Sequence, residues 1–509
     1  MAAGISAIEF HERTKHSPRS IREGGHRLDF DNQPRPYKIY ETQPRLSLAE
    51  TIRPSPLPAL AAIADDVPPV SDDSVLDLDA LTQCCYYSTG ITRRVRRRNR
   101  EHLFRAAACT GALYHIDLYL VTAGVGDLDP GVYHFDPMSM SVDVLREGDF
   151  RGRLVDATGG HPHVAQAPTS IIATSTWWRN AWKYQARTYR HAFWDGGTVI
   201  ANLLAVAASL ERPASTVTGF ADDSVAGLIG VTPEHEAPIA ILPVGTGSPP
   251  PEAPAAAPLD PDTRPLSDHQ VDYPLIHEAY SASTLDDGDA AAEWRRRWPD
   301  ISVGTRSAGD GDRITLDPVS PTRASKVPLY RAITRRGSCR EYTRDSLNFR
   351  KVSTVLDRAI HGVPLDDDLP TNTLRFNDAY CLINGIEAVD PGAYQLHVGD
   401  GSLERLHAGD YRDEAGHLAL DQRLGADAAL SIYFMTDLEA MSDRLGDRGY
   451  RVAQLEAAIT AGRLYLGAYA HSDLGATGLT FYDDVVTDFF GPRASGQTPT
   501  FLLTLGRPA

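Results

Sequence analysis

A lysine and a tyrosine that could move protons stand side by side at Lys183 and Tyr184, in the aromatic stretch TWWRNAWKYQARTYRHAFWDGG at residues 176–197. Arg187 follows within two helical turns, and a long apolar run at 198–210 comes directly after the stretch. Aromatic-rich helices are most often core elements, and basic residues in them can keep their charged ends in water. Composition alone therefore leaves two interpretations open, a core helix or a helix that presents a reactive pair.

Two further patterns suit a flat, phosphorylated ligand. RRGSCREY at 335–342 precedes a predicted helix at 349–360, and guanidinium forks with a serine hydroxyl and free backbone N–H groups are what a phosphate requires. An exposed basic cap of the helix is the alternative interpretation. LGATG at 474–478 supplies Gly475 and Gly478, which would let the backbone approach a flat ring closely. A helix stop would explain the same glycines.

The chain contains an internal repeat with a constant offset of 261 residues. The matched pairs are DPGVYHF at 129–135 with DPGAYQL at 390–396, EGDFR at 147–151 with AGDYR at 408–412, RTYR at 187–190 with RGYR at 448–451, FADDSVAGLIG at 220–230 with FYDDVVTDFFG at 481–491, and PIAILPVG at 238–245 with PTFLLTLG at 499–506. This self-similarity indicates a tandem duplication, with halves near 1–245 and 326–509. We expect the halves to pack about a pseudo-twofold axis, as the subunits of an isologous homodimer do.

The two copies differ at the residues that could do chemistry. The Lys-Tyr pair at 183–184 stands opposite Arg444 and Leu445, so the pair occurs once. The loop ACTGALY at 108–114 stands opposite LPTNTLR at 369–375, which has no glycine, and the arginine-rich segment has no arginine in its counterpart. Because each half has lost what the other kept, we expect one composite ligand site in each chain.

Local patterns divide the chain into four segments. Residues 1–70 are rich in proline and form an irregular arm, 71–245 form the first domain, 246–325 are a Pro/Ala-rich linker and connecting segment with one helix, and 326–509 form the second domain. Strands are expected at 115–121, 129–135 and 238–245, and a helix is expected at 77–89.

Composition excludes several classes of protein. With 42% hydrophobic and 23% charged residues the chain is globular, and a formal net charge of −17 argues against nucleic-acid binding. The basic run RRVRRRNRE at 93–101 is interpreted as a solvated loop or helix face, with an acidic partner as the alternative. The apolar run 198–210 is too short to cross a bilayer, which takes about 20 residues.

The cysteines and histidines give no metal signature. The five cysteines include no CxxC pair, which suits a reducing compartment, and the N-terminus has no apolar signal core. His161, His163 and His191 lack carboxylate or cysteine partners at ligand spacing, so no metal site is expected. These features predict a cytoplasmic protein.

Several motifs together resemble one family. FHERTKHSPRSIREGGHRLDFDNQPRPYKIY at 10–40, RAAACTGALYHIDLYLV at 105–121 and WKYQARTYR at 182–190 resemble the SagB-type dehydrogenases of the nitroreductase-like flavin superfamily. RRGSCREY and LGATGLTFYDD resemble the phosphate and flavin-edge motifs of the nitroreductases. The similarity covers nearly the whole chain outside the linker.

The resemblance implies an α+β fold of two tandem nitroreductase-like domains, each a sheet flanked by helices, packed as an intramolecular pseudo-dimer with FMN between them. It implies that Lys183 and Tyr184 are catalytic. The implied cofactor-binding residues are Arg335, Arg336, Ser338, Arg340 and Arg507 at the phosphate, Gly475, Thr477 and Gly478 along the isoalloxazine, and Cys109, Thr110 and Gly111 from the other half. Arg187 is added to the cofactor-binding residues, with an architectural role as the alternative, because it is shared with the other half as Arg448. The family loop usually reads Pro-Ser where this chain has Ala108-Cys109, and it ends in proline where this chain has His115.

The family's best-attested reaction is oxidation of a thiazoline or oxazoline in a peptide to the azole. On this hypothesis a tyrosinate at Tyr184, favoured by the neighbouring ammonium, removes the proton. The substrate would be a peptide or a small molecule, and a cyclodehydratase is a candidate partner. Two alternatives stay open, an NAD(P)H-dependent reductase of a small molecule and a non-catalytic partner in a modifying complex.

Overall fold

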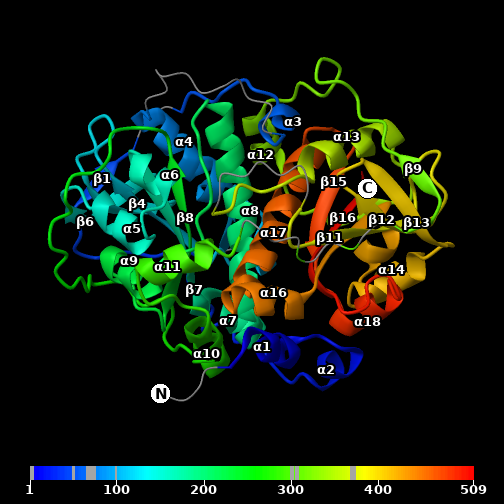
Figure 1. Cartoon of the computed structure of the whole chain (residues 1–509), viewed down its shortest axis with the longest axis horizontal. Coiled ribbons are helices and arrows are strands. Elements are labelled where there is room, and N and C mark those ends of the chain that lie inside the picture. The colour runs from blue at the N-terminus through cyan, green and yellow to red at the C-terminus, as the bar shows by residue number, and fades with distance from the viewer. Residues whose placement is uncertain are drawn as a thin grey trace.

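Two antiparallel sheets, each flanked by helices, form the centre of the protein (Figure 1). The computed structural model describes residues 5–48, 52–64, 76–97, 100–298, 303, 306, 309–366 and 374–509. The strand order is β1-β6-β5-β4-β7-β8 in the first sheet. It is β10-β16-β14-β11-β12-β13-β9 in the second, where β15 also pairs with β16.

The first sheet and its helices come from the first half of the chain. Its strands are β1 (Arg45–Ser47), β4 (Ile116–Thr122), β5 (Gly131–Asp136), β6 (Ser141–Glu147), β7 (Thr169–Thr176) and β8 (Glu236–Val244). Its helices are α4 (Leu78–Thr89), η1 (Thr110–Ala112), α5 (Arg151–Ala157), α6 (Pro162–Gln166), α7 (Trp177–Tyr184), η2 (Gln185–Arg187), α8 (Thr188–Ser209) and α9 (Asp222–Ile229). The expected helix and strands of this half are confirmed.

The second half builds the same arrangement. Its strands are β10 (Tyr342–Thr343), β11 (Asp378–Ile383), β12 (Gly392–His397), β13 (Ser402–Ala408), β14 (Leu430–Thr436), β15 (Gly475–Leu479) and β16 (Thr498–Pro508). Its helices are α12 (Leu329–Arg335), α13 (Phe349–Ala359), α14 (Arg412–Leu418), α15 (Arg423–Asp427), α16 (Leu438–Leu445), α17 (Arg448–Tyr469) and α18 (Asp483–Phe489).

The sequence repeat is also a structural repeat. β5, β6 and α5 begin 261 residues before β12, β13 and α14. The strand orders β6-β5-β4-β7-β8 and β13-β12-β11-β14-β16 are equivalent. The predicted α+β fold, with two tandem domains packed as an intramolecular pseudo-dimer, is confirmed.

The long helices α8 and α17 cross where the two halves meet. A Cβ added to Gly197 would lie 2.4 Å from the Cβ of Ala458, and a Cβ added to Gly462 would lie 2.5 Å from the Cβ of Ala201. Gly197 and Ala458 are counterparts in the repeat, as are Ala201 and Gly462. Residues that contact their own counterparts lie beside the symmetry axis, so the pseudo-twofold axis passes between these helices. The glycines permit this close approach.

Two buried aspartates clamp the halves together in a reciprocal way. Asp222 at the start of α9 accepts from α17, and its counterpart Asp483 at the start of α18 accepts from η2 and α8. The contacts are Arg448 Nη1–Asp222 Oδ2 (2.6 Å), Arg451 Nη1–Asp222 Oδ1 (2.7 Å), Arg190 Nη1–Asp483 Oδ1 (2.6 Å) and Arg187 Nη1–Asp483 Oδ2 (3.3 Å). Each aspartate therefore binds the arginines of the other half, as an isologous interface requires.

The arm and the connecting segment wrap around this pair of domains. The arm contains α1 (Ala7–Thr14), α2 (Pro18–Glu23), β1 and α3 (Ala59–Ala62). The connecting segment contains α10 (Pro274–Ala282), α11 (Gly288–Arg295) and β9 (Arg313–Thr315), which joins the second sheet. Two helices therefore stand where one was expected. The predicted boundary between residues 70 and 71 lies outside the described residues.

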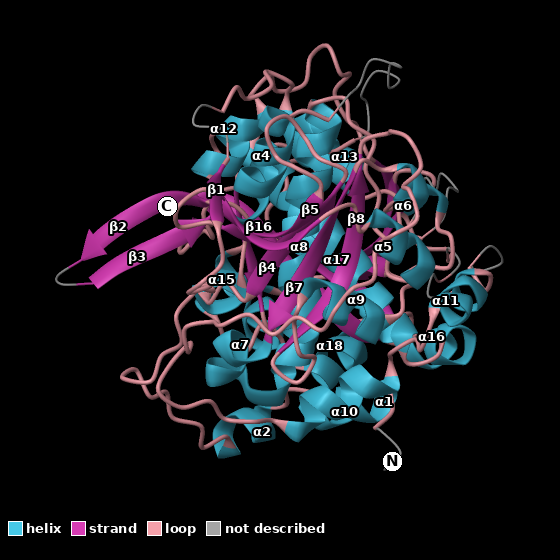
Figure 2. Ribbon diagram, turned by 90° about the vertical axis from the view of Figure 1, so that its left-hand side faces the viewer, coloured by secondary structure: helices cyan, strands magenta, loops and turns pink. Residues whose placement is uncertain are grey.

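The basic run at 93–101 belongs to a two-stranded hairpin that projects from the body (Figure 2). Its strands are β2 (Ile91–Arg97) and β3 (Arg100–Arg105), joined in antiparallel register. The interpretation as a loop or helix face was wrong. Its cross-strand pairs, Arg93 with Phe104 and Val95 with His102, supply the alternation of a strand, which the density of arginine obscures in the sequence.

Within the described residues, one stretch, Trp177–Ser209, has the length and hydropathy of a membrane span. In its apolar 18-residue segment, 89% is buried inside the protein. The stretch includes α7 and α8, and α8 packs against β4, β7 and β8 of the first sheet and against α17.

Candidate functional site

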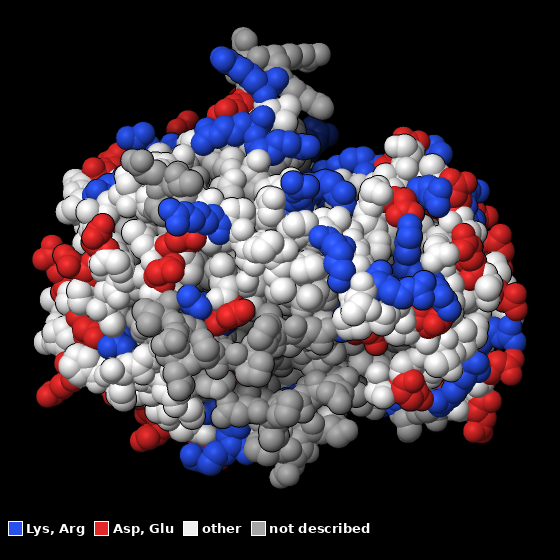
Figure 3. All heavy atoms as spheres, turned by 90° about the horizontal axis from the view of Figure 1, so that it is seen from above, with Lys and Arg blue, Asp and Glu red and all other residues white. Residues whose placement is uncertain are grey.

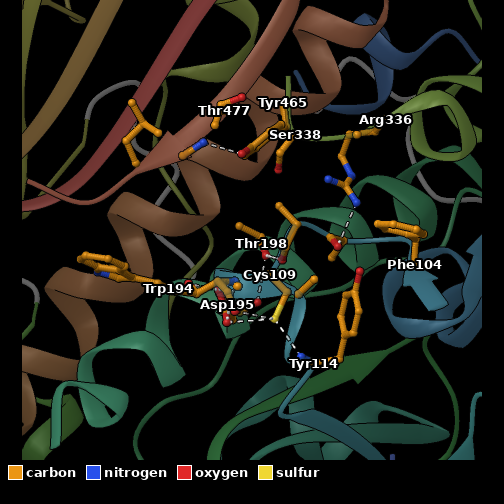
Figure 4. Close-up of a pocket in the computed structure, with 18 of the residues that line it drawn as sticks. Phe104, Cys109, Tyr114, Trp194, Asp195, Thr198, Arg336, Ser338, Tyr465 and Thr477 are labelled. Carbon is orange, nitrogen blue, oxygen red and sulfur yellow. Dashed lines mark hydrogen bonds between the residues drawn. The ribbon is translucent and has the colours of Figure 1, made fainter. Parts of the chain in front are cut away.

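A cavity of about 830 Å³ lies between the two halves of the protein (Figure 4). The first half lines it with the end of α7, the loop that contains η1, a face of α8 and the β2–β3 hairpin. The second half contributes the segment after α12, β15 and a face of α17. Figure 4 shows Ser338, Tyr465 and Thr477 on one side and Cys109 and Asp195 on the opposite side. This volume is typical of a small-molecule or cofactor site.

Lys183 and Tyr184 line the cavity from the C-terminal end of α7. The helix ends there because Gln185 has a φ of 51°. The Lys183 ammonium lies 5.1 Å from the centre of the Tyr184 ring, and a Cβ on Gly111 would lie 2.9 Å from the Tyr184 hydroxyl. Glycine at 111, which has a φ of 64°, leaves room for that hydroxyl. Both residues therefore line the cavity, and Tyr184 also packs against the hydrophobic core.

The pKa values of this pair run against a tyrosinate base. Burial, followed by the nearby Asp195 carboxylate and Cys109, raises the pKa of Tyr184 well above its usual value. Burial and the Arg340 guanidinium lower the pKa of Lys183. The expectation that the ammonium makes Tyr184 a phenolate is therefore wrong. The two shifts run in opposite directions, since the pKa of the lysine is lowered and the pKa of the tyrosine is raised.

Asp195 of α8 fixes the loop that carries three predicted cofactor residues. It accepts from the Thr110 backbone N–H (2.9 Å) and hydroxyl (2.8 Å), from the Cys109 thiol (3.1 Å), and it contacts His115 Nε2 (2.8 Å). Its counterpart Glu456 accepts the backbone N–H groups of the equivalent loop in the second half. The carboxylate is therefore a structural support in both copies, which holds Cys109, Thr110 and Gly111 against the cavity.

Cys109, His115 and Asp195 bring three potential metal ligands within 4.8 Å of one another. Each already has a partner, since His115 Nδ1 also lies 2.8 Å from the Ser175 hydroxyl. Burial, the Asp195 charge and the hydrogen bond to it raise the pKa of the Cys109 thiol. Because a metal binds the thiolate, this arrangement favours a protonated structural cysteine.

The arginine-rich segment faces the cavity from the second half. Arg336, Ser338 and Arg340 all line it. Arg336 also spans the halves, because its Nε donates to Ala106 O (2.9 Å) and its Nη2 to Ala107 O (3.0 Å). The guanidinium thus holds the segment against the loop that carries Cys109 and brings the two parts of the site together.

β15 forms the adjoining wall. The Thr477 hydroxyl donates to Cys339 O (2.6 Å), which ties the strand to the arginine-rich segment. The Gly478 N–H donates to the Tyr465 hydroxyl (2.5 Å). Thr477 and Gly478 line the cavity as predicted, and the lack of a side chain at Gly478 leaves this wall flat.

Four residues predicted to bind the cofactor do not line the cavity. Arg187 is buried in the Asp483 ion pair, so the structure assigns it to the interface between the halves. Arg335 donates to two carbonyl oxygens at the end of α17. Gly475 packs against Cys339 on the far side of the strand, and Arg507 lies on β16 opposite β10. For Arg187 and Arg335, the contacts that hold their own elements in place direct the side chains elsewhere.

Several cavity residues were missed by the sequence analysis. Tyr465 and His191 both line the cavity. Their counterparts at the 261-residue offset are Leu204 and Val452, so the comparison of copies that singled out Lys183 and Tyr184 could also have found them. Asp195 could not be found this way because its counterpart is also acidic. The hairpin residues carry no such signal.

The counterpart of the cavity is filled by the connecting segment. The indole N–H of Trp294 on α11 donates to Leu445 O (2.8 Å), and a Cβ on Gly219 would lie 3.0 Å from the same indole. The counterparts of Leu445 and Gly219 are Tyr184 and Thr480, which line the cavity. Trp294 is buried and so occupies the position that a ligand would need in the second copy.

A carboxylate completes this plug. Asp366 accepts from the backbone N–H groups of Thr218 and Gly219, each at 2.7 Å. The counterparts of these residues, Leu479 and Thr480, line the cavity of the first copy. Among the described residues, an internal acid therefore occupies two backbone donors whose counterparts line the cavity in the other copy.

The residues around the open cavity fit FMN. Arg336, Ser338 and Arg340 provide guanidinium and hydroxyl donors for a phosphate. Tyr465 and the flat wall of β15 provide a surface for an aromatic ring. The buried Thr480 hydroxyl has no partner among the described residues and is available to a ligand that carries ring nitrogens and carbonyls.

Residues 94–246 match the model of the Nitroreductase family. This part of the chain is therefore similar to the Nitroreductase family. A protein of Methanocaldococcus jannaschii that bears the name nitroreductase MJ1384 is 24% identical over 172 residues, which are 34% of this chain and 82% of that protein. Such domains are oxidoreductases and in general use a flavin.

Solved structures extend the likeness to the rest of the chain. A crystal structure of an Anabaena variabilis protein assigned as a nitroreductase has a TM-score of 0.76 and 24% identity, and covers 99% of both chains. The nitroreductase-like fold therefore includes both domains and the connecting segment. The E. coli microcin synthetase McbBCD complex, with truncated pro-MccB17 bound, has a TM-score of 0.30 and 19% identity over 48% of this chain and 87% of that one.

Proposed function

We propose that the protein is an FMN-dependent oxidase that converts thiazoline or oxazoline rings of a ribosomal peptide to azoles, the activity of the SagB-type dehydrogenases that its sequence resembles. The observation that carries the proposal is that Lys183 and Tyr184 line the same cavity as Arg336 and Ser338 of the other half. On this proposal the pair would transfer protons and the arginine-rich segment would hold a phosphate in the same cavity, although Tyr184 and Arg336 stand 152 positions apart in the sequence.

Arg336, Ser338 and Arg340 would hold the phosphate of FMN. Thr477 and Gly478 would lie along its ring system, and the loop that Asp195 supports would approach it from the first half. Bound FMN would supply the acceptor for the hydride that the substrate ring loses. Arg187, Arg335, Gly475 and Arg507 are left out of this proposal because none of them lines the cavity.

Oxidation of an azoline to an azole removes one proton as well as one hydride, and Lys183 is the group suited to take the proton. Its Nζ would accept the proton from the ring carbon, because burial and Arg340 lower its pKa. Tyr184 would keep its proton and donate a hydrogen bond to the ring nitrogen, because its pKa is raised. The two side chains thus take opposite roles, acceptor and donor.

The substrate would reach this site as a peptide, with a cyclodehydratase as the partner that forms the azoline ring. A cytoplasmic location suits this assignment, since all five cysteines are free.

The proposal is tested by mixing the purified flavin-loaded protein anaerobically with a thiazoline-containing peptide. We expect the flavin absorbance to bleach, and after admission of oxygen we expect a product lighter by the mass of H₂. Rapid bleaching by NADPH together with no reaction of the peptide would contradict the proposal and indicate a reductase of small molecules.

We expect one FMN for each polypeptide, because Trp294 and Asp366 fill the counterpart of the cavity. The measurement is the ratio of released flavin, from its absorbance, to protein, from amino-acid analysis. Arg336→Ala should lower the flavin content, whereas Arg331→Ala, an exposed substitution on the preceding helix α12, should leave it unchanged. A ratio of two flavins per chain would contradict the one-site arrangement.

Arg340→Gln is expected to shift the pH dependence of turnover at saturating FMN. The neutral amine of Lys183 is the active form, so activity should rise with pH as this group loses its proton. Removing the Arg340 charge removes a cause of the lowered pKa, so the rise should move to higher pH. Arg340→Lys keeps the charge and should leave the profile close to that of the wild type. An unchanged profile in Arg340→Gln would exclude Lys183 as the titrating group.

A further inference from the structure

The β2–β3 hairpin concentrates positive charge in an acidic protein. Residues 91–105 contain seven arginines and one glutamate, whereas the chain has a formal net charge of −17. Arg93, Arg94 and Arg96 are exposed. Figure 3 shows lysine and arginine side chains gathered on the projection at the upper edge of that view. A solvated arm of this charge attracts anionic partners over a distance of about one Debye length, ~10 Å.

The two faces of the hairpin differ. Arg93, Val95, His102 and Phe104 line the cavity, and the Arg93 guanidinium lies 4.5 Å from the centre of the Phe104 ring. Because side chains alternate along a strand, Arg94 and Arg96 point to the other face. The inner face, which mixes apolar and cationic groups, is therefore continuous with the catalytic cavity.

The charge inside the cavity has the same sign. Lys183, Arg336 and Arg340 line it with Arg93, and Asp195 is the one carboxylate on this lining within the described part of the chain. Asp195 is already bound to the loop beside it. A ligand that enters along the hairpin therefore passes a series of cations.

The hairpin also has unpaired edges. Among the described strands, β2 and β3 pair only with each other. An exposed strand edge offers backbone N–H and C=O groups to an extended peptide, which can add as another strand. Backbone pairing would supply affinity and the arginines would supply selectivity for acidic side chains.

From these features we propose that the hairpin docks an acidic segment of the peptide substrate, and that the segment lies extended along the hairpin while the residue to be oxidised enters the cavity. This inference rests on the proposed function and narrows its substrate class to acidic peptides. An acidic peptide fits the hairpin better than a nucleic acid does. The inner face places Val95 and Phe104 among the charges, and it leads into a cavity and not along a surface that could follow a phosphate backbone.

The test is fluorescence anisotropy of a short, labelled, glutamate-rich peptide with the full-length protein. Arg94→Ala/Arg96→Ala and Arg93→Ala should each weaken binding, by about tenfold for the double variant. Arg94→Lys/Arg96→Lys should retain most of the affinity because it keeps the charge. Arg19→Ala/Arg296→Ala removes two exposed arginines elsewhere and should bind as the wild type does. Circular dichroism should show the same thermal transition in all variants, since the changed side chains are exposed.

Equal affinity of all variants for the acidic peptide would overturn the proposal, as would tighter binding of a labelled oligonucleotide than of the peptide. Binding of the acidic peptide needs no flavin turnover and can therefore be measured separately from oxidation. Loss of this binding while azoline oxidation of other peptides persists would overturn the docking role alone. Retained, hairpin-dependent binding without oxidation of any azoline would instead contradict the proposed function.

Discussion

Lys183→Ala and Tyr184→Phe are each expected to lower turnover by about 100-fold or more while FMN stays bound. The lysine variant loses the acceptor of the ring proton, and the tyrosine variant loses the hydroxyl that donates to the ring. Neither side chain belongs to the proposed phosphate cradle, so flavin content should not change. Steady-state rates and flavin absorbance, measured on the same preparations, check both parts of this prediction.

The repeat offers a matched control for these variants. Arg444 is the counterpart of Lys183 and lies on α16, away from the open cavity. Arg444→Ala should therefore retain the turnover of the wild type. Full activity in both Lys183→Ala and Tyr184→Phe would remove the pair from the mechanism, and loss of flavin in either would show that the residues hold the cofactor.

Asp483→Asn is expected to destabilise the protein by about 3–5 kcal/mol, because it leaves the buried Arg187 and Arg190 without a counter-charge. Asp222→Asn should have a similar effect, since it leaves the equivalent arginines of α17 unpaired. The free energy of unfolding, measured by urea denaturation, checks the prediction. The effect belongs to the interface between the halves and should appear without any change at the Lys183 side of the cavity.

The neighbouring residue gives the control for this prediction. Asp484 is exposed and pairs with Lys15 at the surface, so Asp484→Asn should cost at most about 1 kcal/mol. Equal stabilities of the Asp483 and Asp484 variants would contradict the clamp.

The clamp also has a defined pH dependence. Burial works to raise the pKa of Asp483, but Arg190 and Arg187 outweigh it and hold the pKa well below the ordinary value. A carboxyl group with a depressed folded-state pKa stabilises the protein fully above its unfolded pKa of about 3.9. The contribution is lost as the pH falls through the folded-state pKa, so the difference between wild type and Asp483→Asn should shrink only in strong acid.

Comparison of the two copies accounts for most of what could be predicted about the site. The single occurrence of Lys183 and Tyr184, and of the arginines near 336–340, singled out residues that line one cavity between the two halves. The same offset makes Arg187 and Arg448 equivalent residues. An arginine that both copies keep is expected to have a structural role. Their assignment to the interface required the structure, because Arg187 meets Asp483 across 296 residues of sequence.

The roles of the reactive pair could not be read from their adjacency. Two neighbouring residues at a helix end need not direct their charges at each other, and here the ammonium lies beside the ring of Tyr184 while Asp195 affects the hydroxyl. Asp195 reaches the site from α8 and is recognised only when the loop around Cys109 is folded against it. A pKa depends on these distant groups and on burial, neither of which is local in the sequence.

The sequence by itself determined the duplication, the α+β architecture and the identity of the lysine, tyrosine and arginines that line the cavity. These follow from periodicity and from differences between copies, which are properties of the chain order. Only the tertiary structure decided that burial and Asp195 raise the pKa of Tyr184, that Arg187 belongs to the interface, that Trp294 packs at the counterpart of the cavity and that the basic run is a hairpin at the cavity. Each of these depends on contacts between residues far apart in the chain, and such contacts exist only once the two halves have packed.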